Sequence, residues 1–198
     1  MKSDEIKWNR RYSSGKYPTE PHDAVVAFHT FSKKGIALDI AAGNGRNSCF
    51  LAENGFQVDA VDISSVGLKS INQKNPAVNT IQADLDDYKI LEDRYDLIVN
   101  INFLDRRLFP RIKSGLRDSG LLIFQTFMDP RLTGAAFDPQ KVDRYLKPNE
   151  LVHSFLSLRV LAYEEKEVTF STGEILKAAL LVAKKENMDA FNAHGNKI

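Results

Sequence analysis

Three aspartates and one glycine-containing turn are the residues of this chain with the clearest chemical potential. Asp39 lies near the end of the apolar stretch 35–40, just before the turn, and Asp62 and Asp84 directly follow the next two apolar stretches, 56–61 and 78–83. The intervals from 39 to 62 and from 62 to 84 each match about one strand plus one helix. Because parallel strands end at one edge of a sheet, we expect the three carboxylates to form one pocket floor.

The turn, residues 41–45, separates a short apolar strand from a helical pattern over 46–54. Gly43 and Gly45 permit backbone angles that a side chain would forbid, and they let a ligand lie against the main chain. A third glycine of the pattern Gly-x-Gly-x-x-Gly is missing, because Ser48 takes its place. Near Asp39, a pyrophosphate would meet a repulsion of about 4 kcal/mol for unit charges ~4 Å apart at an effective dielectric of ~20. A ligand with an ammonium and a sulfonium is favoured instead, which points to S-adenosylmethionine.

Each of the other two aspartates has a place in such a site. Asp62 would accept hydrogen bonds from ribose hydroxyls, as the acid that ends a second Rossmann strand does. Asp84 would flank the adenine and accept from its exocyclic amine. The alternative is that each aspartate only caps the helix that follows. The matched spacing, with the glycine turn at the first aspartate, favours a nucleoside site.

Residues 38–48, with Val61-Asp62-Ile63-Ser64 and Gln82-Ala83-Asp84, resemble class I S-adenosylmethionine-dependent methyltransferases. Within that superfamily, residues 43–48 followed by 51–55 resemble the tellurite-resistance type. The resemblance implies an α/β fold, Rossmann-like and doubly wound, with a mostly parallel seven-stranded sheet in the order 3-2-1-4-5-7-6, an antiparallel last strand and helices on both faces. It implies S-adenosyl-L-methionine as cofactor, bound by Asp39, Ala41, Gly43, Gly45, Asn47, Asp62, Ile63, Asp84, Leu85, Asn100, Ile101 and Arg11. Arg11 belongs with Trp8 and Tyr12 to a leading helix that would close over the cofactor.

The apolar pattern predicts the elements that must position these residues. Strands are expected at 35–40, 56–61, 78–83, 95–100, 121–127, 158–163 and 175–183, and helices at 3–12, 23–31, 46–54, 64–74, 104–116 and 148–155. Pro110 predicts a helix start or kink near that residue. Residues 117–120 are expected to turn, and 164–172 to bridge the last two strands. The irregular segment 128–147 is expected to close the acceptor pocket.

Composition limits the class of protein. The 198 residues suit a single domain, here 1–186 with 1–33 as N-terminal helices and lid, followed by a flexible tail over 187–198. A formal net charge of +1 gives no footprint for nucleic acid. The single cysteine, Cys49, excludes an internal disulfide and is typical of a cytoplasmic protein. No stretch suggests a signal segment or a membrane span, so no membrane partner is expected.

The sequence therefore predicts methyl transfer from S-adenosylmethionine to a small-molecule acceptor by in-line displacement. No catalytic base is assigned; His22, His29, Asp105 and Tyr145 are candidates by location, each with a structural alternative. Neither histidine has partners at metal-ligand spacing, so no metal is expected. Two alternatives stay open: a non-catalytic module that binds the cofactor or a partner protein, and an NAD(P)-dependent oxidoreductase. The pattern indicates neither the acceptor nor the oligomeric state.

Overall fold

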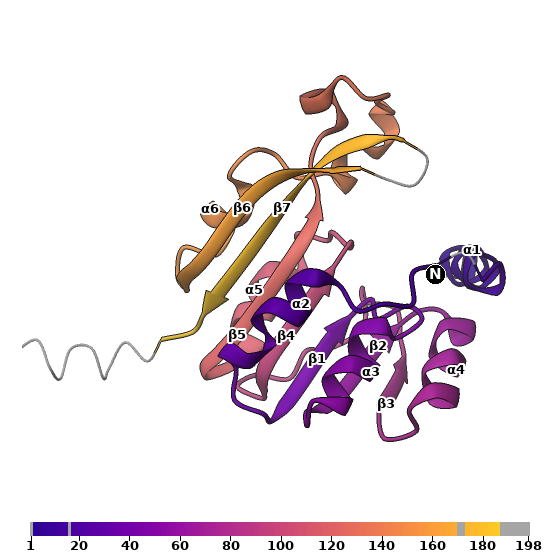
Figure 1. Ribbon diagram of the computed structural model, residues 1–198, viewed down its shortest axis with the longest axis vertical. Coiled ribbons are helices and arrows are strands. Elements are labelled where there is room, and N and C mark those ends of the chain that lie inside the picture. The colour runs from indigo at the N-terminus through magenta and orange to yellow at the C-terminus, as the bar shows by residue number, and fades with distance from the viewer. Residues whose placement is uncertain (1, 16, 170–172, 187–198) are drawn as a thin grey trace, which may run out of the picture.

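A seven-stranded sheet runs through the computed structural model, which describes residues 2–15, 17–169 and 173–186 (Figure 1). The strand order is β3-β2-β1-β4-β5-β7-β6. The first five strands run parallel, and β7 is antiparallel to both β5 and β6. The predicted fold class and strand order are confirmed. The strands are β1 Ile36–Ile40, β2 Gln57–Asp62, β3 Asn79–Gln82, β4 Tyr95–Ile101, β5 Leu116–Phe127, β6 Arg159–Thr169 and β7 Ile175–Lys184.

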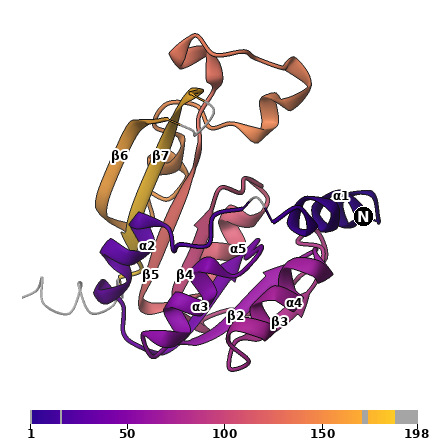
Figure 2. The ribbon, with the colours of Figure 1, turned by 45° about the vertical axis from the view of Figure 1, so that its right-hand side comes forward.

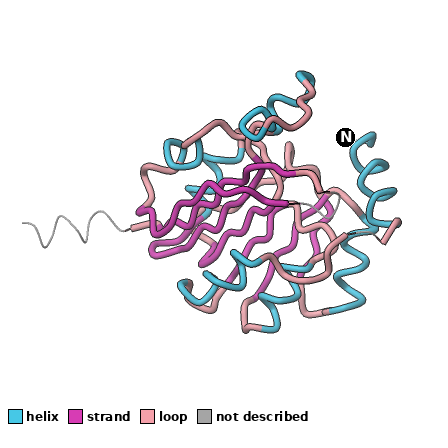
Figure 3. The backbone as a smooth tube through the Cα atoms, turned by 45° about the horizontal axis from the view of Figure 1, so that its top comes forward, coloured by secondary structure: helices cyan, strands magenta, loops and turns pink. Residues whose placement is uncertain are grey.

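Helices cover both faces of the sheet, as the tube view shows (Figure 3). One face carries α2 Asp23–Phe28, α3 Arg46–Glu53 and α4 Ser65–Lys74, and the other carries α5 Leu108–Gly115 and α6 Glu150–Ser154. The two layers have separate cores, with Phe124 and Phe155 in one and Leu51 and Ile71 in the other. β1 and β4 are buried on both faces, which explains their continuous apolar sequences.

Two segments rise from the edge of the sheet where the parallel strands end (Figure 2). Helix α1, Lys2–Ser13, lies against α4. The insertion, residues 128–148, follows β5 and contains two 3-10 helices, η2 Pro130–Thr133 and η3 Pro139–Arg144. A parallel bridge between Met128 and Leu146 closes its base. No helix among the described residues is long and apolar enough to cross a membrane.

Three local predictions differ from the structure. The turn expected at 117–120 is wrong, because β5 begins at Leu116 and absorbs these residues as a bulge between the pairs Tyr95–Leu116 and Leu97–Leu121. The bridge expected at 164–172 is strand as far as Thr169, which pairs with Ile175. The helix expected at 23–31 ends at residue 28 and continues as the 3-10 helix η1, His29–Phe31.

The prediction for Pro110 is confirmed. Helix α5 begins at Leu108, so the proline lies in its first turn, where a missing N–H is tolerated. The predicted tail at 187–198 lies outside the described residues.

Candidate functional site

The loop after β1 adopts the left-handed conformation at three positions, Ala41 (φ +54°), Gly43 (φ +59°) and Gly45 (φ +75°). A Cβ added at Gly43 would lie 2.3 Å from the hydroxyl of Tyr12, whereas one at Gly45 would lie 2.3 Å from Cγ1 of Ile71. Gly43 therefore faces the lid, and Gly45 allows α4 to pack closely. Ala41 has a Cβ, and its left-handed backbone costs about 1–2 kcal/mol. Strain of this kind is typical of ligand-binding loops.

Asp39 lies beneath this loop. Its side chain is only 1% exposed, and Ser48 Oγ donates a hydrogen bond to Asp39 Oδ2 at 2.6 Å. Burial raises the pKa of Asp39 to about 7; the charge of Asp62 acts in the same direction, and Ser48 and Arg46 oppose it. A cation above the loop would favour the ionised carboxylate.

Asp62 ties the end of β2 to the glycine loop. Its Oδ2 accepts a hydrogen bond from the N–H of Gly43 at 2.8 Å, and its Oδ1 accepts from the N–H of Ser64 at 2.7 Å. Burial raises the pKa of Asp62, although the hydrogen bonds from Ser64 and Gly43 oppose that rise. Each oxygen keeps a further lone pair, so the carboxylate can still accept from a ligand hydroxyl.

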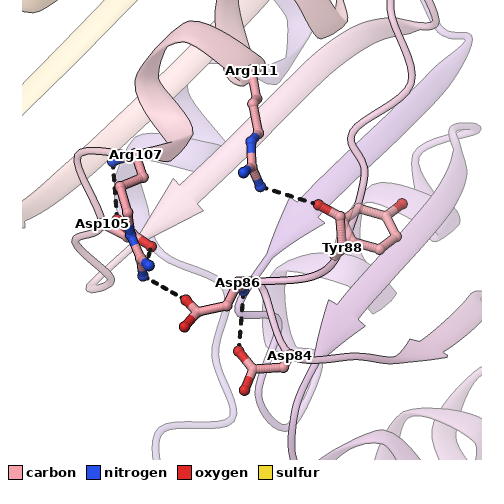
Figure 4. Close-up of polar contacts among 6 residues, drawn as sticks. All are labelled: Asp84, Asp86, Tyr88, Asp105, Arg107 and Arg111. Carbon is pink, nitrogen blue, oxygen red and sulfur yellow. Dashed lines mark hydrogen bonds and ion pairs between the residues drawn. The ribbon is translucent and has the colours of Figure 1, made fainter. Parts of the chain in front are cut away.

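Asp84 lies in the loop after β3, which is tied to the loop after β4 (Figure 4). Asp84 Oδ1 accepts from the N–H of Asp86 at 3.1 Å. Arg107 forms ion pairs with Asp86 and with Asp105, and so joins the two loops. Arg111 donates to the carbonyl oxygen of Tyr88 at 3.5 Å in the same region. On the predicted adenine side of the site, ion pairs and hydrogen bonds therefore hold the loops after β3 and β4 together.

The predicted asparagines have structural partners. Asn47 Oδ1 accepts from the N–H of His22 at 2.9 Å, which holds the entry to α2 against the glycine loop. Asn100 Nδ2 donates to the carbonyl oxygen of Phe103 at 2.7 Å and shapes the loop after β4. That loop also contains a strained residue, Asn102, with φ +59°. The side chains of both asparagines stabilise loops that border the site.

The predicted apolar residues divide between the core and the surface of the site. Leu85 and Ile101 are both 8% exposed and belong to the cores on opposite faces of the sheet. Ile63 is half-buried beside Asp62.

Helix α1 covers the glycine loop. The Tyr12 hydroxyl rests on Gly43, and the Tyr12 ring stacks on Trp8 with 5.9 Å between ring centroids. Burial and the charge of Asp62 raise the pKa of Tyr12, so its phenol stays protonated. Arg11 is exposed and lies 5.1 Å from the centroid of the Trp8 ring.

Asn9 fixes α1 in this position. Its Oδ1 accepts from Ser64 Oγ at 2.7 Å and from the N–H of Val66 at 3.2 Å, and its Nδ2 donates to Ser65 Oγ at 3.2 Å. Because Ser64 also donates its N–H to Asp62, helix α1 and the Asp62 carboxylate share one partner. The predicted lid is thus coupled to the predicted cofactor residues.

Arg46 lies beside the glycine loop, near Asp39 and Tyr12, and is not among the residues predicted from the sequence. It is the first residue of α3, where a cation opposes the helix dipole. Burial lowers the pKa of Arg46, while the nearby Asp39 and Tyr12 raise it. It donates one hydrogen bond, at 3.4 Å, to the carbonyl oxygen of Glu20. An arginine at the first position of a helix is unfavourable, and its place directly after the glycine turn is visible in the sequence. This pattern could have indicated Arg46.

The candidate bases have other roles or lie elsewhere. His22 caps α2, and burial, with Arg46, lowers its pKa to about 4, so the ring is neutral. His29 is buried, with its Nδ1 bonded to the carbonyl oxygens of Val25 and Val26. Asp105 is held by Arg107. No group of three or more His, Cys, Asp or Glu side chains in the described ranges is arranged to hold a metal ion.

A cavity of about 770 Å³ is lined by residues of the insertion and by Arg106 from the loop after β4. Its walls include Arg106, Leu132, Val142, Tyr145 and Lys147. The fourth candidate base, Tyr145, is therefore placed in this cavity.

The insertion also approaches α1. Burial lowers the pKa of Lys7, and the nearby cations Arg144 and Arg11 lower it further. The insertion and α1 therefore flank the same edge of the sheet.

The family model for the tellurite resistance protein TehB matches residues 6–122, which hold the glycine loop, all three aspartates and the loop after β4. The chain belongs to this family. The predicted resemblance is thereby confirmed. The match ends within β5, before the insertion. The irregular segment 128–147, which is expected to close the acceptor pocket, thus lies beyond the match.

Individual proteins agree with this assignment. YqeM of Bacillus subtilis (strain 168), named as a methyltransferase, is 29% identical over 104 residues, which cover 46% of this chain and 42% of YqeM. The crystal structure of TehB from Haemophilus influenzae has a TM-score of 0.71 at 22% identity, covering 90% of this chain and 67% of that one.

Two further solved structures share the fold. A 1,6-didemethyltoxoflavin N1-methyltransferase from Burkholderia thailandensis, with S-adenosylhomocysteine bound, has a TM-score of 0.67 at 17% identity, covering 93% and 87% of the two chains. The [4+2]-cyclase SpnF has a TM-score of 0.64 at 14% identity, covering 83% and 79%. At these identities the likeness shows the fold of class I methyltransferases, and the activity has to be argued from the site.

Proposed function

We propose that this chain binds S-adenosylmethionine and transfers its methyl group in line to a small-molecule acceptor. The observation that carries the proposal is the joint geometry of Gly43, Asp62 and Asp39. Because Gly43 has no side chain, Tyr12 of the lid helix can lie directly on its main chain. The Asp62 carboxylate accepts a hydrogen bond from the N–H of Gly43, and Asp39 is buried beneath the loop. Membership of the TehB family supports the same cofactor.

The donor set fits the cofactor group by group. Asp39 and Arg46 would hold the ammonium and the carboxylate of the methionine portion, since Asp39 is buried beneath the turn and Arg46 is a half-buried cation that directly follows it. Asp62 would accept from the ribose hydroxyls. The main chain at Ala41, Gly43 and Gly45 would lie against the ligand, with Asn47 fixing the loop.

The remaining predicted residues line the rest of this site. Asp84 and Leu85 would flank the adenine beside Ile63, and Asn100 and Ile101 would border the methionine portion. Arg11 and Tyr12 would lie on the lid side. Two carboxylates near the loop disfavour a pyrophosphate there, which weighs against a nicotinamide dinucleotide.

When bound, the cofactor supplies a methyl group already activated by the sulfonium. The protein then needs mainly to orient the acceptor, and positioning alone can supply about 7–11 kcal/mol. His22 is a neutral cap and Asp105 is held by an arginine, which favours an acceptor that needs no deprotonation. Soft oxyanions and small organic nucleophiles meet this requirement.

The proposal is tested first by calorimetric titration with S-adenosylmethionine of the wild type, Asp62→Ala and Asp62→Asn. We expect the alanine variant to lose at least about tenfold in affinity, or 1.4 kcal/mol, and the asparagine variant to lose less, since its amide oxygen still accepts. Unchanged affinity in Asp62→Ala would show that the ribose contact is misplaced.

The second test is release of S-adenosylhomocysteine with a panel of tellurite, selenite and small thiols. Release with any member supports methyl transfer. Binding without release would favour the non-catalytic alternative, and an absorbance change of a nicotinamide cofactor on turnover would favour the oxidoreductase.

A further inference from the structure

Arg106 joins the loop after β4 to the insertion. Its Nε and Nη2 donate to the two carboxylate oxygens of Glu150 at 2.5 and 2.9 Å. Its Nη1 donates to the carbonyl oxygen of Asp143 at 2.7 Å, and Nη2 also donates to that of Tyr145 at 2.9 Å. One guanidinium thus contacts three points of the segment 143–150. Two parallel bonds to a carboxylate give this contact a specific geometry, which lysine cannot reproduce.

Glu150 completes the contact from the other side. Its Oε2 also accepts from the N–H of Lys147 at 2.8 Å, which closes the turn into α6. The Arg106 and Glu150 side chains are 36% and 17% exposed, so this pair is less solvated than the pair of Arg107 with Asp86, at 66% and 44%. Burial opposes ionisation of Glu150, but its hydrogen bonds with Arg106 and Lys147 leave its pKa below the usual value. The pair is therefore ionised at neutral pH.

The loop that carries Arg106 is fixed at its other end as well. The N–H of Asn102, in its left-handed conformation, donates to the carbonyl oxygen of Gln125 on β5 at 2.8 Å. This loop follows β4 at the point where the order of strands reverses, beside β1, where ligands bind in open α/β sheets. Arg106 therefore joins the loop after β4 to a wall of the 770 Å³ cavity.

We propose that Arg106 is a positioning residue that holds the insertion, residues 128–148, against the loop after β4 and so sets the shape of the acceptor pocket. We call this attachment of the insertion to the loop after β4 the latch, and it is inferred from the hydrogen bonds of Arg106. The assignment of the cavity to the acceptor rests on the proposed methyl transfer. The latch and the methyl transfer can therefore fail separately.

Hydrogen exchange of Arg106→Gln, Arg106→Lys and Arg107→Gln tests the latch. We expect peptides from the insertion to exchange about tenfold faster in Arg106→Gln, equivalent to ~1.4 kcal/mol of opening free energy. Arg106→Lys should restore only part of the protection, because an ammonium cannot make the forked contact. Arg107→Gln is the matched control, since its ion pairs go to Asp86 in the loop after β3 and to Asp105 in its own loop rather than to the insertion, and it should leave exchange of the insertion unchanged.

Binding and kinetics test the positioning role. Because the hydrogen bonds of Arg106 go to Asp143 and Tyr145 of the insertion and to Glu150 at the start of α6, Arg106→Gln should bind S-adenosylmethionine with wild-type affinity in a calorimetric titration. With tellurite, or the member of the panel that the wild type methylates, KM for the acceptor should rise about tenfold at nearly constant kcat, because the acceptor binds less well to an open pocket.

Unchanged exchange of the insertion in Arg106→Gln would overturn the latch. A loss of cofactor affinity together with a fall in melting temperature would also overturn it, because the residue would then stabilise the whole domain. If the wild type methylates nothing, the proposed function fails, and the exchange comparison still decides on the latch.

Discussion

The substitution Gly43→Ala tests where the cofactor lies, and the structure supplies a matched control. Gly134 in the insertion has a similar left-handed conformation, φ +70°, and a Cβ there would meet nothing within 4 Å. Alanine at either position adopts an unfavourable backbone, partly compensated by a stiffer unfolded chain. We expect both variants to lose about 1 kcal/mol of unfolding free energy. A difference between them then reports what lies against Gly43.

At Gly43 the new Cβ would lie 2.3 Å from the Tyr12 hydroxyl and 2.9 Å from its Cζ. The hydroxyl is the far end of a side chain, so the Tyr12 ring and helix α1 move while the loop stays. The methyl group also takes space that a ligand on the main chain needs. We expect affinity for S-adenosylmethionine to fall at least about tenfold in Gly43→Ala and to stay unchanged in Gly134→Ala. Calorimetry measures this difference.

Trp8 gives an independent readout, since it is the single tryptophan of the chain and stacks on Tyr12 at 5.9 Å. Its fluorescence emission should shift in Gly43→Ala and not in Gly134→Ala. Adding Tyr12→Phe removes the atom at 2.3 Å but leaves Cζ at 2.9 Å, so the double variant should recover part of the emission but not the cofactor affinity. Equal affinities in the two glycine variants would refute a cofactor above Gly43. An unshifted Trp8 emission would refute the contact of Tyr12 with the loop.

Three further outcomes follow from the same loop. The raised pKa of Asp39, about 7, means that the folded state holds the proton more tightly than the unfolded state. The free energy of unfolding should therefore fall as pH rises from about 4 to about 7, by at most about 4 kcal/mol. At pH 8, Asp39→Asn should have a larger free energy of unfolding than the wild type in urea unfolding, and it should bind S-adenosylmethionine more weakly. Arg46→Gln should weaken S-adenosylmethionine about tenfold and leave decarboxylated S-adenosylmethionine unaffected in calorimetry, because only the former has the carboxylate; equal losses would place Arg46 elsewhere. Asn9→Ala should release α1, read as faster proteolysis between residues 2 and 13, with Ile6→Ala, an exposed position on the same helix, as control.

Much of the fold was predictable because its signals are local. Buried strands such as β1 and β4 have continuous apolar sequences, and Ser64 caps α4 by accepting from the N–H of Gly67. The errors arise where the structure of a segment depends on strand pairing with residues far away in the sequence. The outer part of β6 is rich in charge, because it is an edge strand with a solvated side, and this composition resembles a loop. The bulge in β5 depends on pairing with Tyr95, which no local pattern reveals.

The candidate site was predictable in part for a similar reason. The glycine turn and the spacing of the aspartates can be read along the chain. The partners of Asn47 and Asn100, in contrast, are main-chain atoms of residues 22 and 103, and main-chain atoms leave no mark in a sequence. Arg106 reaches Glu150, 44 residues away, across a loop that no motif describes. Residues that hold a site together are therefore harder to predict than residues that face its ligand.

Three unfavourable features of the described structure lie within residues 39–46. Asp39 is a buried carboxyl with a raised pKa, Ala41 has a left-handed backbone, and Arg46 places a cation at a helix N-terminus. A ligand with an ammonium and a carboxylate would stabilise both charged residues at once, whereas a neutral nucleoside would stabilise neither. We therefore infer that selectivity for the cofactor resides at its amino-acid end. We therefore expect adenosine alone to bind far more weakly than S-adenosylhomocysteine. In Asp39→Asn the affinities of these two ligands should differ less than they do in the wild type.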